Sequence, residues 1–132
     1  MTRCLVVDDS RIMRKLARAM LEELHFDTAE AEDSDAALQY CRADTPELII
    51  LDLDLPNGGG IEFLRKLRQV REGKQPVAVV FCATENDIGQ ITAALKAGAN
   101  DFVQKPFNGP DLLAKLAAVG LIDRAALGRS AA

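Results

Sequence analysis

The sequence predicts an α/β fold in which a parallel sheet is covered by helices on both faces. Short apolar segments alternate along the chain with longer segments whose apolar residues recur at helical spacing. One short segment, 76–82, is almost continuously apolar, which is typical of a parallel strand buried on both faces. The chain has 132 residues, of which 48% are hydrophobic and 27% charged, as expected of one ordinary globular domain.

The first elements follow from local signals. A strand is expected at 4–7, and Ser10 after it is a good N-cap. Apolar residues between Ile12 and Leu24 recur at helical spacing and predict a helix that runs through Glu23. A weaker strand pattern follows at 27–31. Ser34 then opens a helix over 35–42, which closes before Pro46.

The rest of the chain repeats the alternation. We expect strands at 48–51, 76–82 and 101–104, a glycine-containing loop at 55–60, and helices at 61–72, 88–97 and 111–119. Five strands alternating with five helices imply right-handed crossovers and a doubly wound, parallel five-stranded sheet of the flavodoxin-like (βα)5 type, in the order 2-1-3-4-5. Residues 1–123 are predicted to form the domain and 124–132 a frayed tail.

Composition narrows the classes of function. A net charge of −4 argues against binding to nucleic acid, which favours a basic face, so a protein partner or a metal fits better. No apolar stretch is long enough to cross a bilayer, and no leader sequence is evident, so we expect a cytoplasmic protein with no membrane association. The three cysteines, Cys4, Cys41 and Cys82, form no CxxC pair and are expected to be buried, reduced thiols.

Charged residues follow three of the predicted strands. Asp8 and Asp9 follow the first, Asp52 the third and Lys105 the last. Because ligands bind at the carboxyl ends of strands in such sheets, these residues indicate a site for a divalent cation and a phosphoryl group. Each also has an ordinary interpretation, as a helix cap, a turn residue or a loop lysine. Together, however, neighbouring carboxylates would be costly without a cation.

These residues carry a family resemblance over nearly the whole chain. The sequence resembles the receiver domain of two-component response regulators, of the single-domain chemotaxis (CheY) type. The motifs that support it are Asp8-Asp9 followed by Ser10-Arg11, Asp52 followed by Leu55-Pro56 and Gly60, Ala97-Gly98-Ala99, and Lys105-Pro106-Phe107.

The resemblance implies a chemistry for the site. Asp52 would accept a phosphoryl group from a histidine kinase or a phosphotransfer protein while Mg²⁺ neutralises the incoming charge. Asp9, Asp52 and the backbone carbonyl of Asp54 would hold the Mg²⁺, with Asp8 acting directly or through water. Lys105 would pair with the phosphoryl oxygens, and positioning and charge stabilisation would suffice without a general base.

The sequence departs from the family at the switch. A threonine or serine is usual at the end of the fourth strand, but an ungapped count places Ala83 there, with Thr84 next. Either Thr84 supplies the hydroxyl after a one-residue adjustment, or the site lacks it; the register favours Ala83. Phe102 occupies the aromatic switch position, with plain core as its other interpretation. The resemblance implies a cis bond before Pro106, with an ordinary trans turn proline as the alternative, and Gly58-Gly59-Gly60 predicts a mobile loop.

The predicted function is a stand-alone receiver, a signalling protein and not a metabolic enzyme. Its output would pass through altered protein binding at the face formed by 88–97, 101–104 and 111–119, by a monomer or a weak dimer. A degenerate, phosphate-independent binding module is the first alternative, with Ala83 as its support. The second is a haloacid-dehalogenase-type phosphatase, because Leu51-Asp52-Leu53-Asp54 resembles its nucleophile motif, although that motif usually follows a first strand.

Overall fold

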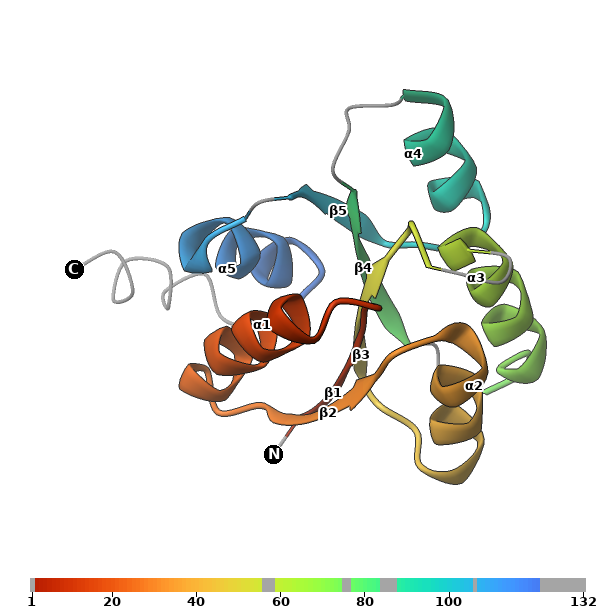
Figure 1. The fold of residues 1–132 in the computed structure, drawn as a ribbon. Helices are drawn as coiled ribbons and strands as arrows, with labels where there is room; N and C mark the ends of the chain where they lie inside the picture. The colour runs from red at the N-terminus through yellow and green to blue at the C-terminus, as the bar shows by residue number, and fades with distance from the viewer. Residues whose placement is uncertain (1, 56–58, 75–76, 84–87, 106, 122–132) are drawn as a thin grey trace.

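The computed structural model describes residues 2–55, 59–74, 77–83, 88–105 and 107–121 (Figure 1). Five parallel strands form one sheet in the order β2-β1-β3-β4-β5, which confirms the predicted topology. The strands are β1 (Arg3–Val7), β2 (Asp27–Ala31), β3 (Leu48–Asp52), β4 (Ala78–Ala83) and β5 (Asp101–Gln104). The helices are α1 (Arg11–Glu23), α2 (Ser34–Ala43), α3 (Gly59–Val70), α4 (Ile88–Lys96) and α5 (Gly109–Ala118). None of the helices described here is long and apolar enough to span a membrane.

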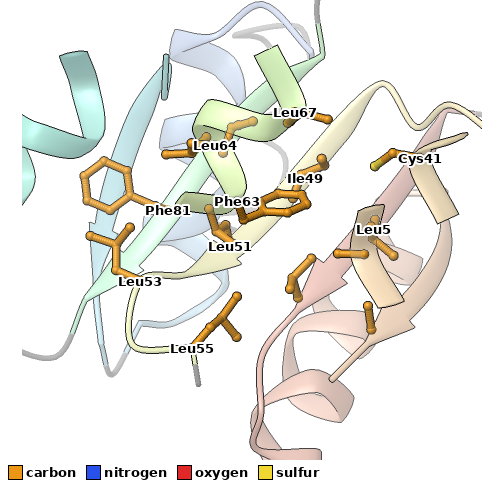
Figure 2. Close-up of a cluster of buried hydrophobic side chains, with 14 of the residues drawn as sticks. Leu5, Cys41, Ile49, Leu51, Leu53, Leu55, Phe63, Leu64, Leu67 and Phe81 are labelled. Carbon is orange, nitrogen blue, oxygen red and sulfur yellow. The ribbon is translucent and has the colours of Figure 1, made fainter. Parts of the chain in front are cut away.

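Helices cover both faces of the sheet. α1 and α5 lie on one face, and α2, α3 and α4 lie on the other (Figure 1). Alternate residues of β1 and β3 therefore enter two cores: Val6 and Ile50 pack with α1 and α5, whereas Leu5 and Leu51 pack against the opposite helices. Figure 2 shows the second core, where Phe63 of α3 lies among the strand side chains. Burial on both faces explains the nearly continuous apolar strands.

α3 and α5 begin a full two residues earlier than the sequence predicted, whereas α2 begins one residue earlier, at Ser34. α3 includes Gly59 and Gly60, for which the sequence predicts a loop, because the Gly60 N–H donates to the Leu53 carbonyl at 2.9 Å and fixes the helix start against the end of β3. α5 begins at Gly109 instead of Asp111, because Asn108 caps it. The Asn108 side chain accepts from the Asp111 N–H at 2.9 Å, in a reciprocal capping box.

The apolar pattern of α1 is wider than its buried face. Ser10 caps the helix as predicted, accepting from the Met13 N–H at 3.3 Å. Ala17 and Leu21 are buried, but Ile12 and Leu16 are 72% and 49% exposed. Helical spacing alone does not locate the contact with the sheet, because the apolar stripe extends past it.

The three cysteines are free and buried, as expected. Burial raises the pKa of the Cys41 thiol to about 11 and that of Cys82 to about 12, and it also raises the pKa of Cys4. A thiol with so high a pKa carries almost no thiolate near neutral pH, which is typical of structural cysteines.

Candidate functional site

The predicted site residues meet at the carboxyl edge of the sheet. Asp8 follows β1, Asp52 ends β3, and Lys105 follows β5. The parallel register pairs Val7 with Leu51, which brings Asp8 and Asp52 to the same edge. Asp8 and Asp52 are 5% and 4% exposed, whereas Asp9 is exposed. Carboxylate oxygens of the three aspartates lie within 4.8 Å of one another.

Lys105 joins two of these carboxylates. Its Nζ lies 2.8 Å from Asp8 Oδ2 and 3.4 Å from Asp52 Oδ2, and its backbone N–H donates to the Ala83 carbonyl at 2.8 Å. Burial by itself would lower the pKa of the ammonium. The hydrogen bond to Asp8 and the attraction of both carboxylates outweigh burial, so the pKa of Lys105 is raised and the group stays charged.

The surroundings of Asp52 disfavour the ionised form of its carboxyl group. Burial raises the pKa of its carboxyl group, and the neighbouring Asp8 adds to the effect. The Asp54 N–H, 3.1 Å from Asp52 Oδ1, and the Lys105 ammonium oppose the shift without cancelling it. A further cation beside Asp52 would favour the ionised, nucleophilic form.

Asp8 is the most constrained of the three aspartates. Its Oδ1 accepts from the Ser10 N–H at 2.9 Å, and its backbone N–H donates to the Ala31 carbonyl at 3.1 Å. Its backbone carbonyl accepts from Arg14 Nη1 at 2.7 Å. No sequence pattern singles out Arg14, since the contact depends on how α1 packs beside β1.

The donor set fits a hard divalent cation. Three carboxylates supply oxygen ligands, and Mg²⁺ commonly keeps several waters and takes only one or two carboxylates from a protein. Asp54 lies in the turn after β3, and its backbone N–H is bonded to Asp52. The carbonyl of Asp54 stays a predicted ligand.

Of the residues predicted at or beside the switch, the structure describes Ala83 and Phe102. Ala83 ends β4, is 3% exposed and pairs with Gln104. Phe102 is half-buried, and its ring stacks on that of Phe81 with 5.6 Å between centroids. The alternative hydroxyl, Thr84, and the predicted cis-proline, Pro106, lie outside the described residues. Ala83 therefore brings no hydroxyl to this edge of the sheet.

Comparison with known proteins agrees with this geometry. The family described as the response regulator receiver domain matches residues 4–117. The chain belongs to this family of receiver domains. It is 40% identical over 116 residues to the KDP operon transcriptional regulatory protein KdpE of Escherichia coli. The matched region covers 88% of this chain and 50% of that protein.

Solved structures resemble this receiver closely. The chemotaxis protein CheY4 of Vibrio cholerae superposes with a TM-score of 0.84 at 27% identity, over 90% of this chain and 98% of that chain. The receiver domain of NtrX from Brucella abortus gives a TM-score of 0.78 at 30% identity, over 89% and 97% of the two chains.

The receiver spans about half the length of the first curated relatives that it matches, which include KdpE and the phosphate regulon regulator PhoB of Escherichia coli. Receiver domains are signalling modules of two-component systems and interact with histidine kinases.

Proposed function

We propose that this receiver takes a phosphoryl group on Asp52 from a histidine kinase or a phosphotransfer protein, in a Mg²⁺-dependent reaction. The observation that carries the proposal is a buried carboxylate with an ammonium 3.4 Å away and two further carboxylates beside it. An Asp52 oxygen forms a bond to phosphorus as the P–N bond of the donor breaks, and the imidazole nitrogen keeps the electron pair. The product is an aspartyl phosphate.

The aspartates and Lys105 would have different roles in this reaction. Asp9, Asp52 and the Asp54 carbonyl would hold Mg²⁺, with Asp8 acting directly or through water, and the ion would supply positive charge to neutralise the phosphoryl group. Lys105 already lies beside Asp52 and keeps its charge, so it can pair with a phosphoryl oxygen attached there. Transfer that depends on positioning and charge needs no general base from the protein.

We further propose that phosphorylation changes binding to a downstream protein at the face formed by α4, β5 and α5. Two conformations that differ by a few kcal/mol are enough for an added charge to shift their populations. Because Ala83 lacks a hydroxyl, coupling between Asp52 and Phe102 would depend on packing or on Thr84. Residues 1–123 are the proposed folded unit, and stand-alone action and a monomeric or weakly dimeric state remain predictions.

The test is intact-mass spectrometry after incubation with Mg²⁺ and acetyl phosphate, a small phosphoryl donor. We expect one phosphoryl adduct on the wild-type protein and none on Asp52→Ala. A more abundant or longer-lived phosphoryl adduct on Ala83→Thr would show that the missing hydroxyl is a real departure from the family. Absence of any adduct, together with absence of Mg²⁺ binding by titration, would refute the phosphoacceptor function.

The alternatives give different results. A degenerate binding module would bind its partner equally well with Asp52→Ala. A phosphatase would turn over phosphate monoesters, but the family assignment and the place of Asp52 after the third strand favour the receiver.

A further inference from the structure

Arg14 connects α1 to the backbone of the site. Its side chain is only 13% exposed. Nη1 donates to the Asp8 carbonyl at 2.7 Å, and Nε donates to Glu30 Oε1 at 3.0 Å. One guanidinium thus joins the end of β1 to β2.

The contact acts on a particular peptide. The Asp8 carbonyl belongs to the planar unit that continues into the backbone nitrogen of Asp9. A donor on this oxygen therefore restricts the orientation of the peptide between the two aspartates. The Asp8 N–H is already bonded to Ala31 in β2, so Arg14 completes the fixation of the Asp8 backbone.

Glu30 orients Arg14. Burial would raise the pKa of the Glu30 carboxyl, but its hydrogen bonds to Arg18 and Arg14 outweigh burial and lower the pKa. Oε1 accepts from Arg14, and Oε2 lies 3.1 Å from Arg18 Nη1. The ionised carboxylate therefore holds two arginines, of which only Arg14 reaches the aspartate backbone among the described contacts.

We propose that Arg14, oriented by Glu30, is a positioning residue that sets the Asp8-Asp9 peptide for binding Mg²⁺. The inference rests on the proposed function of the site. Positioning and simple electrostatics predict opposite results for removal of the guanidinium. A lost positive charge would strengthen cation binding, whereas a loosened ligand backbone weakens it.

The experiment compares Arg14→Ala with Arg18→Ala in the full chain. Both variants lose one positive charge and one contact with Glu30, but none of the contacts described for Arg18 reaches Asp8, and Arg18 also pairs with Glu22 at 2.7 Å. Mg²⁺ affinity is measured by isothermal titration calorimetry. We expect Arg14→Ala to weaken binding roughly tenfold or more, as for other residues that support metal ligands, and Arg18→Ala to leave it within about twofold.

A metal-free measurement separates positioning from folding. Amide hydrogen exchange at Asp8, whose N–H is bonded to Ala31, should accelerate in Arg14→Ala and not in Arg18→Ala, while the urea midpoints report the stability of each variant. Arg14→Lys is the second variant in case Arg14→Ala fails to fold. It keeps the positive charge but lacks the planar fork that donates to both Glu30 and the Asp8 carbonyl, so it should still weaken Mg²⁺ binding several-fold, whereas electrostatics alone predicts no change.

The outcomes are distinguishable. Equal Mg²⁺ affinity in Arg14→Ala and Arg18→Ala, or tighter binding in Arg14→Ala, would overturn the positioning role while leaving the proposed function intact. If the wild-type protein bound no Mg²⁺, the proposed function and the inference would both fail.

Discussion

Gly60 in the first turn of α3 lies against the strand that carries the proposed phosphoacceptor. A Cβ added there would lie 2.8 Å from the Asp52 carbonyl oxygen and 2.9 Å from Leu53 Cα. Real Cβ atoms essentially never approach other atoms so closely. Both neighbours are backbone, so the clash cannot be relieved by turning a side chain, and either α3 or the end of β3 must move.

Gly109 provides the matched control. It opens α5, and a Cβ there would meet nothing within 4 Å. Replacing glycine by alanine in a helix stabilises a protein by up to about 1 kcal/mol, and overpacking costs about 1–3 kcal/mol. The gain from replacing a helical glycine by alanine is common to both variants, so only the overpacking cost distinguishes them. Gly60→Ala should therefore be less stable than Gly109→Ala by about 1–3 kcal/mol in free energy of unfolding.

The assay is urea unfolding followed by circular dichroism. With a slope of about 2 kcal/mol/M, a difference of about 2 kcal/mol separates the two midpoints by roughly 1 M. The same variants can be treated with acetyl phosphate, where Gly60→Ala should form less adduct because Asp52 is displaced. Equal midpoints for the two variants would refute the argument that close backbone approach requires glycine at this position.

Three further predictions concern charged groups. Lys105→Met should destabilise the metal-free protein by about 2–3 kcal/mol, because the carboxylates of Asp8 and Asp52 stay buried without their ammonium, and added Mg²⁺ should raise the urea midpoint again. Burial raises the folded-state pKa of Asp52 above its ordinary value of 3.8, so the protonated carboxyl group favours the folded state. This contribution to the free energy of unfolding is lost as pH rises from 3.8 through the raised value. In urea titrations above pH 3.8, wild type should therefore lose stability relative to Asp52→Asn. Arg68→Ala should lower the free energy of unfolding by about 2 kcal/mol, because its guanidinium donates to two backbone carbonyls, whereas Arg65→Ala, which loses only an exposed ion pair, should change it by less than about 0.5 kcal/mol.

The sequence predicted the fold well because its signals are local. Alternating strands and helices imply the sheet order through general rules of connection, and the carboxyl ends of strands place Asp8, Asp52 and Lys105 together. Helix starts were less predictable. The low helix propensity of glycine argued against a start at Gly59, and a bond from Gly60 to Leu53 overrides that preference.

The support of the site was harder to predict than the site itself. Arg14 and Glu30 are 16 residues apart, and nothing local indicates that they touch. Their contact requires β2 to lie beside β1 and α1 to cross above both, which is a property of the assembled sheet. Sequence motifs therefore do not predict residues that support the backbone of metal-binding residues, because backbone atoms of any residue type can be their partners.

The charges at this edge of the sheet favour binding of the cation before phosphoryl transfer. Asp8, Asp9 and Asp52 with Lys105 leave two negative charges, which one divalent ion neutralises. A phosphoryl group brings further negative charge to the place where burial already raises the pKa of Asp52. Without the ion, an incoming phosphoryl group meets three carboxylates whose charge the single ammonium of Lys105, already bonded to Asp8, neutralises only in part. Transfer to Asp52 should therefore depend on Mg²⁺ more steeply than partner binding by the unphosphorylated protein.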